Sequence, residues 1–418
     1  MRLSQLFTKT TRNLPADETA RNAQLLIQAG FIHKEMAGVY AFMPLGKIVL
    51  DNIIQIIREE MNAVGGQEIN LTALQSSEVW EASGRWDDEV MDVWFKTKLA
   101  NGSVLGLAPT HEEPLTNLMK RFIGSYKDLP VYPYQFQIKF RNELRSKSGL
   151  MRGREFMMKD LYSFSTDEAQ HQEFYEKISL AYDKVFARLG LGDTTYKTFA
   201  SGGSFSKYSH EFQTISDVGE DTIFVHEGRK LAINKEVYSD EVLAELELDK
   251  ADMVEKTAVE VGNIFTLSTK FSEALDLTYT DEAGASKPVF MGSYGIGPSR
   301  LVGLIAELFA DDKGLVWPEN VAPAKLYIVR LSDKDEVVKQ ADELYNRLTV
   351  SGVGVLYDDR DLRAGEKFAD AELMGIPYRV VISEKTLAAG KYELKARSSN
   401  DSQSVSLELL LKTLGVSA

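Results

Sequence analysis

The stretch FRNELRSKSGLMRGREFMMKDLYSF, residues 140–164, decides the fold of this chain. Apolar segments flank its polar centre, with QFQIKF (135–140) on one side and REFMMKDLYSF (154–164) on the other. The turn-forming run SKSG (146–149) lies between them. This pattern predicts two strands joined by a long loop. The loop and its edges carry Arg141, Arg145, Arg152 and Arg154.

This hairpin is basic in an acidic chain. Residues 120–160 contain ten lysines and arginines against four acidic residues, a local charge of +6 in a chain of net charge −14. Because arginine forks fit phosphate oxygens, the hairpin predicts a site for a polyanion. The alternative is a solvated hairpin with incidental charge. The apolar arms argue against it, since they would bury the aliphatic bases of Arg141 and Arg154 beside a core.

Length and composition bound the possibilities. A chain of 418 residues predicts two or three domains. It has no cysteine, which excludes disulfides, thiolate nucleophiles and cysteine-bound zinc. Its five histidines are scattered without an HxxxH pair, so we expect no metal site. No apolar run approaches about 18 residues and the N-terminus lacks a signal-peptide core, so we expect a cytoplasmic protein without a membrane span.

The FRNE…REF arrangement resembles motif 2 of the class II aminoacyl-tRNA synthetases. With its neighbours it is most similar to the prolyl-tRNA synthetases of the bacterial type, and the likeness covers nearly the whole chain. The resemblance implies an α+β catalytic core, an antiparallel sheet flanked by helices, followed by a C-terminal α/β anticodon-binding domain. It also implies L-proline, ATP with its Mg²⁺, and proline tRNA as substrates and partners, without zinc.

Residues 17–66 predict two helices. DETARNAQLLIQAGFIHK (17–34) and GKIVLDNIIQIIREEMNAVG (46–65) have helical apolar spacing, and GVYAFMPLG (38–46) between them is strand-like. The arrangement resembles motif 1, which forms the homodimer interface of class II enzymes. By pattern alone, a plain core helix explains the second block equally well. The next segment, QEINLTAL (67–74), predicts a strand.

Thr110 and Glu112 stand two apart in APTHEEP (108–114). In an extended segment both side chains face one way, and a hydroxyl with a carboxylate can receive a cationic amine. On the pattern alone, capping of a helix that begins at Pro114 is the favoured alternative. The resemblance assigns both residues to the imino group of proline.

Two further segments carry candidate residues. SHEFQ (209–213) predicts a strand, in which His210 alone would more often be a core histidine than a catalytic one. The family has a GGS…SHEF element here, although in this chain FSKY intervenes. VFMGSYGIGPSRLVGLIAELF (289–309) predicts a strand, a glycine turn and a helix, and resembles motif 3. Without the resemblance, a glycine turn with Arg300 as a surface arginine is the less favoured alternative.

The resemblance implies a role for each candidate. Arg141 would bridge the proline carboxylate and the α-phosphate, and Arg152 and Arg300 would hold the β- and γ-phosphates, so Arg141 and Arg300 are the expected catalytic residues. Glu143 would accept from the adenine amino group and Phe156 would stack on the ring. The remaining ATP residue is Gln213. The proline ring pocket would be shaped by Met158, His210 and Ser293.

The resemblance also divides the chain. Residues 1–216 and 261–320 would form the catalytic domain, and 321–418 the anticodon-binding domain. Residues 217–260, with thirteen acidic and five basic residues, are too short for the inserted editing domain of the long bacterial form. We therefore expect no editing of alanyl-tRNA in cis, and a separate editing protein becomes a possible partner.

Beyond the proline-containing segment GLVWPENVAPAK (314–325), apolar runs and helical patterns alternate, which predicts an α/β module. Its segment DDRDLRAGEKFADAELMGIP (358–377) resembles the anticodon-binding domain of the prolyl, threonyl, histidyl and glycyl enzymes. The resemblance makes Arg360, Arg363 and Lys367 the expected anticodon contacts, although a solvated helix start explains them nearly as well.

Three other functions fit the sequence less well. A sister synthetase for threonine, glycine, serine or histidine is the nearest, but the threonyl enzymes need a cysteine-containing zinc site and the histidyl signature is missing. A non-catalytic tRNA-binding paralogue would be expected to lose a motif arginine, whereas Arg141 and Arg300 are present. A stand-alone editing protein would resemble the insertion that this chain lacks.

Overall fold

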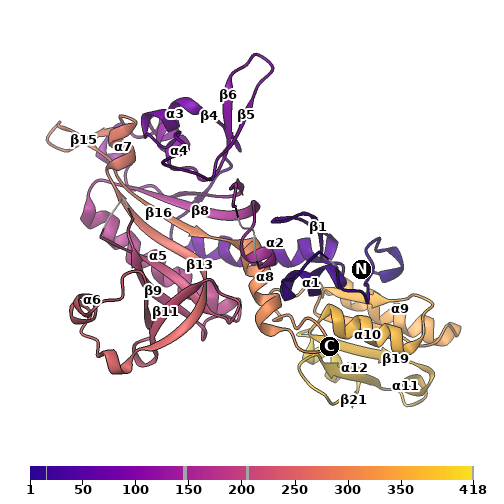
Figure 1. Ribbon diagram of the computed structural model, residues 1–418. Coiled ribbons are helices and arrows are strands. Elements are labelled where there is room, and N and C mark those ends of the chain that lie inside the picture. The colour runs from indigo at the N-terminus through magenta and orange to yellow at the C-terminus, as the bar shows by residue number, and fades with distance from the viewer. Residues whose placement is uncertain (16, 145–147, 204–206, 417–418) are drawn as a thin grey trace.

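The computed structural model describes residues 1–15, 17–144, 148–203 and 207–416. A large body built on a nine-stranded sheet lies beside a smaller C-terminal body (Figure 1). The strand order of the large sheet is β10-β9-β12-β11-β13-β16-β8-β7-β3. The β9–β12 and β3–β7 pairs are parallel and the other pairs are antiparallel. The strands are β3 (Gln67–Glu68), β7 (Pro133–Phe140), β8 (Glu155–Ser165), β9 (Thr195–Ser201), β10 (Tyr208–Ile215), β11 (Asp221–His226), β12 (Leu231–Asn234), β13 (Val254–Ser268) and β16 (Phe290–Ile296).

The basic hairpin predicted from residues 140–164 is confirmed. Strands β7 and β8 pair antiparallel, with Phe140 opposite Glu155 at the end where the connecting segment begins. The connecting segment contains a short 3₁₀ turn, Gly149–Met151. Arg145, Ser146 and Lys147, which the prediction placed in the loop, lie outside the described residues, as do Ser204 to Ser206 of the GGSFSKY segment.

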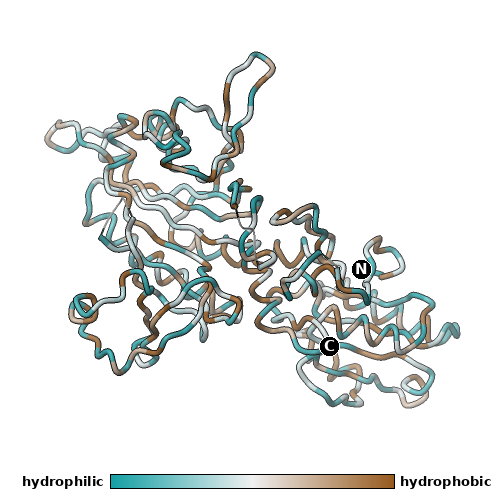
Figure 2. Tube along the Cα trace, viewed as in Figure 1, coloured by the Kyte–Doolittle hydropathy of each residue, from teal (hydrophilic) through white to brown (hydrophobic). Residues whose placement is uncertain are grey.

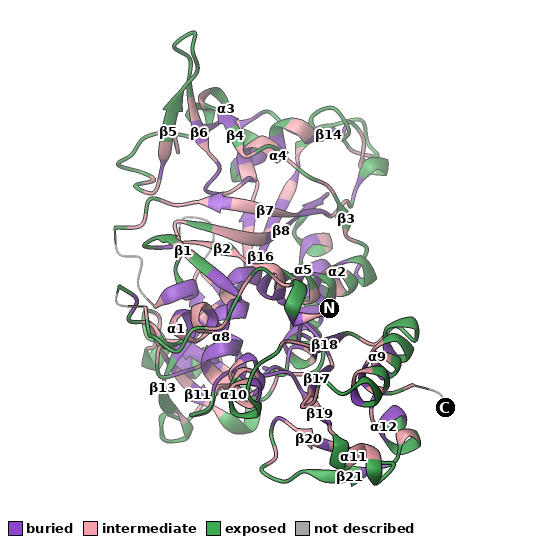
Figure 3. Cartoon of the chain, turned by 90° about the vertical axis from the view of Figure 1, so that its right-hand side faces the viewer, coloured by how far each residue is buried: buried purple, intermediate pink, exposed green. Residues whose placement is uncertain are grey.

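Helices cover the large sheet, and their buried faces pack against it to form the hydrophobic core. Helix α5 (Glu168–Arg188) packs on β8, β13 and β16, and α2 (Pro44–Ala63) packs on α5 and α8 (Pro298–Phe309). Helix α2 starts with proline at its first turn and buries a stripe at helical spacing that includes Val49, Ile53 and Ile57. Figure 3 shows buried residues concentrated where α1 (Arg21–Gln28) and α8 meet.

Two predictions near the N-terminus are wrong in part. The first helix does not reach Lys34, because it ends at Gln28 and Gly30 turns the chain with φ of 76°. Residues Ile32–Met36 instead form β1, which pairs with β2 (Val39–Phe42). The segment 67–74 is not one strand: only Gln67–Glu68 belongs to the large sheet, and β4 (Leu74–Ser76) belongs to a separate sheet.

That separate sheet stands at one end of the large body (Figure 1). It has the order β4-β6-β5, with β5 (Phe95–Lys98) and β6 (Val104–Leu107) forming a projecting hairpin. Helices α3 (Ser77–Ala82) and α4 (Glu112–Met119) pack beside it, around the ring cluster of Trp80, Trp86 and Trp94. Helix α7 (Lys270–Ala274) and the pair β14 (Thr278–Thr280) and β15 (Ser286–Pro288) complete this end.

The acidic segment 217–260 forms part of the large sheet. It contains β11, β12 and the start of β13, and a short helix α6 (Asp240–Glu245) whose Val242 and Leu243 pack with Ile233. The segment therefore adds strands to the large sheet, and its assignment as a remnant of an insertion stays a prediction.

The C-terminal body is the predicted α/β module. Its sheet has the order β18-β17-β19-β20-β21. Figure 2 shows hydrophobic residues along the strands in the interior of both bodies. The N-terminal segment packs against this body: Arg2 lies beside Tyr357, and Ser4 Oγ donates to Asp359 at 2.7 Å. The helices and strands of the C-terminal body are β17 (Leu326–Arg330), α9 (Asp335–Val350), β18 (Val355–Asp358), α10 (Ala364–Met374), β19 (Tyr378–Ile382), α11 (Glu384–Ala388), β20 (Tyr392–Ala396), β21 (Gln403–Val405) and α12 (Leu407–Thr413). Among the described residues of the whole chain, no helix has the length and apolar character that a membrane span requires.

Candidate active site

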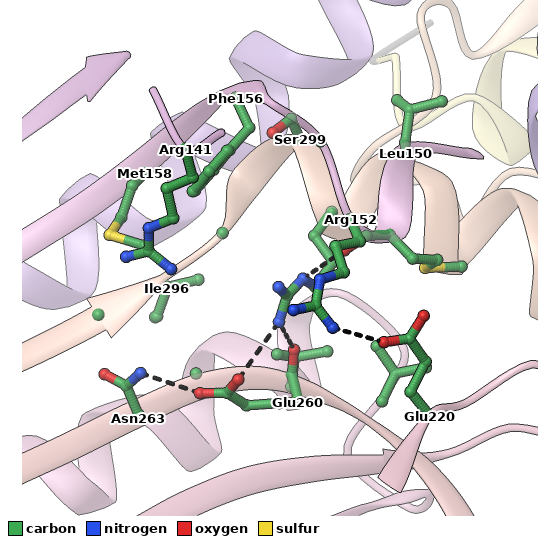
Figure 4. A pocket seen from close by; sticks show the side chains of 18 of the residues that line it. Arg141, Leu150, Arg152, Phe156, Met158, Glu220, Glu260, Asn263, Ile296 and Ser299 are labelled. Carbon is green, nitrogen blue, oxygen red and sulfur yellow. Dashed lines mark hydrogen bonds and ion pairs between the residues drawn. The ribbon is translucent and has the colours of Figure 1, made fainter. Parts of the chain in front are cut away.

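A pocket of about 230 Å³ opens between the basic hairpin, β13, β16 and the start of α8 (Figure 4). The chain brings these elements together because β8, β16 and β13 are neighbours in the sheet and α8 follows β16 directly. Six of the residues predicted for the site line this one pocket: Arg141, Glu143, Arg152, Phe156, Met158 and Arg300.

Glycines form part of the pocket lining. A Cβ at Gly262 would lie 3.1 Å from both Gly295 O and Tyr182 Cε2, closer than ordinary van der Waals contact. At Gly295 it would lie 2.9 Å from Asn263 Oδ1. Both glycines line the pocket, so the sequence leaves a bare backbone there against which a flat ring can lie.

Two of the three pocket arginines are paired with carboxylates. Arg152 donates to Glu143 Oε2 at 3.0 Å and to Glu220 Oε2 at 2.8 Å. Arg300 donates to Met151 O at 2.8 Å and to the Glu260 backbone carbonyl, and lies 3.5 Å from Glu260 Oε2. These contacts fix both guanidinium groups in the protein before any ligand enters.

Arg141 differs from the other two. Its Nε donates to Pro109 O at 3.3 Å, and its guanidinium lies 5.3 Å from the centre of the Phe156 ring. Among the described residues it forms no ion pair with a carboxylate. Burial lowers its pKa, the Arg300 charge lowers it further, and the carboxylates of Glu260, Glu112 and Glu143 oppose that shift. Arg141 is therefore a half-buried cation that can accept an anionic partner.

Thr110 and Glu112 lie next to Arg141 outside the pocket lining. Phe140 N donates to Ala108 O at 2.9 Å, which fixes the start of this segment against β7. Thr110 Oγ1 donates to Glu112 Oε2 at 2.6 Å. Helix α4 begins at Glu112 rather than Pro114, and its N-cap, His111, forms no side-chain capping bond. The predicted start at Pro114 and capping by Thr110 are therefore wrong, although Glu112 and Glu113 do lie in the first turn of the helix.

Three predicted residues lie behind or beside the pocket. His210 Nδ1 lies 2.7 Å from Tyr175 Oη, and burial, with a smaller effect of Lys197, lowers the pKa of His210 to about 3. Ser293 is half-buried on β16. Gln213 is fully buried, and its Nε2 donates to Glu211 Oε2 at 2.8 Å and to Asp221 Oδ2 at 2.9 Å. None of the three lines the pocket as the structure describes it.

The sequence reasoning missed an acidic wall. Glu220, Asp221 and Glu260 line the pocket opposite the arginines, and Asn263 donates to Glu260 Oε1 at 2.9 Å. No short motif marks these residues. The available signal was Glu260 within the apolar run AVEVGNIF (258–265), where a charged residue in a strand needs an explanation.

A second missed feature is a buried polar network beneath Thr110 and Glu112. Lys139 Nζ donates to Asp160 Oδ1 at 2.8 Å and to His111 Nδ1 at 2.7 Å. All three residues are nearly inaccessible. Burial and, less strongly, the Lys139 charge lower the pKa of His111 to about 4, so this imidazole is neutral at physiological pH.

The three predicted anticodon residues have different environments. Arg360 is held by Asp358 (2.7 Å) and Asp370 (2.8 Å). Lys367 is buried, and its Nζ donates to Arg330 O at 2.7 Å. Arg363 is exposed at the start of α10. Within the described ranges, no group of three or more histidine, aspartate or glutamate side chains has the arrangement of a metal site.

Comparisons with known proteins agree with this architecture. Residues 95–309 match the family described as the tRNA synthetase class II core domain (G, H, P, S and T), and residues 325–415 match the anticodon binding domain. The fold, the pocket and these matches define a class II aminoacyl-tRNA synthetase.

Curated relatives of this chain show to which family of class II synthetases it belongs. Proline–tRNA ligases of Maricaulis maris (strain MCS10) and Rhodopseudomonas palustris (strain HaA2) are each 38% identical, over 98% and 97% of this chain and 97% and 98% of theirs. The proline–tRNA ligase of Geobacillus sp. (strain WCH70) is 33% identical over 564 aligned positions, with 99% of each chain covered. The chain belongs to the proline–tRNA ligase family and is an aminoacyl-tRNA ligase, as the motifs predicted.

Solved structures show the same fold at low identity. The prolyl-tRNA synthetase of Cryptosporidium parvum complexed with halofuginone and AMPPNP has a TM-score of 0.77 at 18% identity, covering 94% of this chain and 76% of that one. The same enzyme complexed with L-proline and AMP has a TM-score of 0.75 at 18% identity, covering 94% and 74%. The predicted fold class is confirmed.

Proposed function

We propose that the protein activates L-proline with ATP in the described pocket and transfers the prolyl group to the 3′-terminal adenosine of proline tRNA. The observation that carries this proposal is Arg141. It is half-buried between the pocket and the Thr110–Glu112 segment, and it forms no ion pair with a carboxylate among the described residues. A cation in that position suits a group that joins two anions, the amino-acid carboxylate and the α-phosphate.

The reaction requires the protein mainly to position the two reactants. The proline carboxylate is already ionised and attacks the α-phosphorus in line, and pyrophosphate leaves, so no general base is required. Arg141 holds the two repelling anions together. Arg152 and Arg300 bind the β- and γ-phosphates, which replace Glu220 and Glu260 as their partners. Mg²⁺ arrives with ATP and neutralises phosphate charge.

The nucleotide base and the amino acid occupy opposite sides of Arg141. Phe156 stacks on adenine over the glycine backbone, and Glu143 accepts from the adenine amino group when Arg152 turns to phosphate. Gln213 lies behind Asp221 and donates to its carboxylate, so it supports the adenine side of the pocket. The related Cryptosporidium structures with AMPPNP and with L-proline and AMP support the choice of ligands.

Glu112 and Thr110 receive the imino group of proline. Met158, His210 and Ser293 shape the space for the ring. A neutral His210 supports this role, because an apolar ring needs a wall without charge. Such a pocket excludes the smaller alanine poorly, since each missing methylene costs only about 1–3 kcal/mol.

The remaining expectations concern the rest of the chain. The Geobacillus alignment spans 564 positions, more than the 418 residues present here, which supports the absence of the editing insertion and a need for editing in trans. We place the anticodon contact on the segment that carries Arg363, with Arg360 and Lys367 beside it. We also propose a homodimer through the α2 region and a cytoplasmic location.

ATP–pyrophosphate exchange tests the proposal directly. With proline, alanine, threonine and glycine in parallel and no tRNA, we expect strong exchange with proline and weaker exchange with alanine. Arg141→Ala should reduce proline-dependent exchange by about 10³-fold or more with an unchanged melting temperature. Arg121→Ala, an exposed arginine away from the pocket, is the matched control. Near-normal exchange in Arg141→Ala would overturn the assignment.

A further inference from the structure

One arginine outside the pocket binds both carboxylates at the start of α4. Arg85 Nη1 lies 3.3 Å from Glu112 Oε2, 3.0 Å from Glu113 Oε1 and 3.1 Å from Glu113 Oε2. Its guanidinium sits between the rings of Trp80 (5.2 Å) and Phe271 (5.3 Å). The two rings fix the guanidinium plane, and the plane in turn fixes the two carboxylates.

Glu113 is the unusual member of this group. Its side chain is fully buried, and it accepts from Ser83 Oγ at 2.7 Å in addition to Arg85. Glu112 reaches Thr110 and therefore the region where we place the imino group of proline. Glu113 makes no contact with that region in the described structure, so substrate binding alone does not explain a buried second carboxylate, which is costly to keep.

The charges of Arg85, Glu112 and Glu113, here called the trio, explain why the second carboxylate is kept. With both carboxylates ionised, as at pH 8.5, two carboxylates and one guanidinium leave a net charge of −1 beside the site. The neighbouring buried pair, Lys139 with Asp160, is balanced, and His111 between them is neutral at physiological pH. With Glu113 absent, Arg85 would bind Glu112 alone and cancel the charge that a cationic ring nitrogen needs.

We propose that Glu113 neutralises Arg85, so that Arg85 orients the Glu112 carboxylate without cancelling its negative charge. Arg85 and Glu113 are then positioning residues that set the preference for a substrate whose ring nitrogen carries a positive charge. The inference rests on the proposed function, in which Glu112 receives the imino group.

The first test is Glu113→Gln at pH 8.5. Glu113 Oε1 accepts from both Ser83 and Arg85, so the amide oxygen of glutamine can keep these two bonds, whereas the contact of Arg85 with Oε2 is lost together with the charge. We expect the proline KM in pyrophosphate exchange to rise about tenfold, the effect of one unit charge at roughly 10 Å and an effective dielectric constant of about 20. kcat and the KM for ATP should stay within about twofold. Glu81→Gln, an exposed residue of α3, carries the same change of charge as a control.

A neutral ring isostere separates charge from shape. Tetrahydrofuran-2-carboxylate has the proline ring with oxygen in place of the charged nitrogen. As a competitive inhibitor against proline, it should have the same Ki in the wild type and in Glu113→Gln. The preference for proline over this isostere should then shrink about tenfold. A Ki that rises in parallel with the proline KM would overturn the inference, because the pocket shape would have changed instead.

The double variant Arg85→Gln/Glu113→Gln gives the sharpest contrast. It removes one charge of each sign and returns the net charge beside the site to −1, so the proline KM should fall back toward the wild-type value. A purely structural role predicts that the double variant is at least as impaired as the single one, and that result would overturn the inference. An unchanged proline KM in Glu113→Gln would overturn it as well. Wild-type protein without proline-dependent exchange would overturn the proposed function itself, which keeps the two failures distinct.

Discussion

Asp160→Asn tests the buried network beneath the site. Asp160 Oδ1 accepts from Lys139 Nζ at 2.8 Å, and its Oδ2 accepts from Gln135 Nε2 and Tyr162 Oη, both at 3.0 Å. Lys139 also donates to His111. Tyr162 Oη in turn accepts from the backbone N of His111 at 3.2 Å, so the network holds the segment on which Thr110 and Glu112 lie.

The expected cost follows from these contacts. Removing the carboxylate charge leaves the Lys139 ammonium buried without its partner, which costs about 3–5 kcal/mol. Asparagine keeps one oxygen for Lys139 but places an amide nitrogen opposite two donors, and each lost bond adds about 1 kcal/mol. Burial already lowers the pKa of Lys139, so this lysine can release its proton and limit the penalty. We expect the free energy of unfolding of the catalytic domain to fall by about 4 kcal/mol.

Urea denaturation followed by tryptophan fluorescence measures this change. Trp80 of α3 forms a ring cluster with Trp86 and Trp94, so their emission reports on the catalytic domain. Glu173→Gln on the exposed face of α5 is the control and should leave the midpoint unchanged. Lys139→Met/Asp160→Asn should lose less stability than Asp160→Asn, because it leaves no unpaired charge. A loss below about 1 kcal/mol in Asp160→Asn would refute the reasoning.

Three further outcomes are expected. Burial raises the pKa of Glu113 to about 7, with Arg85 opposing the shift and Glu112 adding to it. Protonation below that pH removes the net negative charge of the trio, so the proline KM should rise up to about tenfold from pH 8.5 to 6, and a flat wild-type profile would contradict this. Gly295→Ala adds a methyl group to the pocket lining, and overpacking of about 1–3 kcal/mol should raise the KM for ATP about tenfold while leaving that for proline unchanged. Arg363→Ala should raise the KM for proline tRNA several-fold in aminoacylation, because an exposed cation that meets phosphate or base contributes about 1–3 kcal/mol; unchanged tRNA-independent exchange serves as its internal control.

Much of the fold could be predicted because its signals are local. The basic hairpin, α2, α5, β16 with α8, and the alternation in the C-terminal body all follow from apolar spacing and from glycine and proline positions. The errors arose where spacing was ambiguous. The run FIHK (31–34) continues a helical pattern, but Gly30 ends the helix and a two-stranded hairpin takes over. Segment 67–74 has strand-forming residues that serve two different sheets.

The residues of the site also fall into those that local sequence predicts and those that it does not. The six predicted residues that share the pocket belong to the hairpin or to the strand–turn–helix of α8, where a short motif fixes their relative positions. Glu260 comes from β13 and Glu220 from the bend just before β11, and only the sheet order brings them to the arginines. Arg85 is a further example: its partners are Glu112 and Glu113, and nothing in SGRWDD (83–88) indicates that contact.

The distribution of carboxylates explains how an acidic chain can hold an anion site. Arg152 and Arg300 each have a resident carboxylate partner, Glu220 and Glu260, that keeps the guanidinium in place while the site is without ligand. Phosphate oxygens can take over those contacts at little reorganisation cost, because the donors are already oriented. Arg141 has no such partner among the described residues, so in the proposed mechanism the ligand supplies the anion for it. A total charge of −14 therefore reflects, in part, the partners that preorganise the cationic groups, and it does not oppose the binding of ATP.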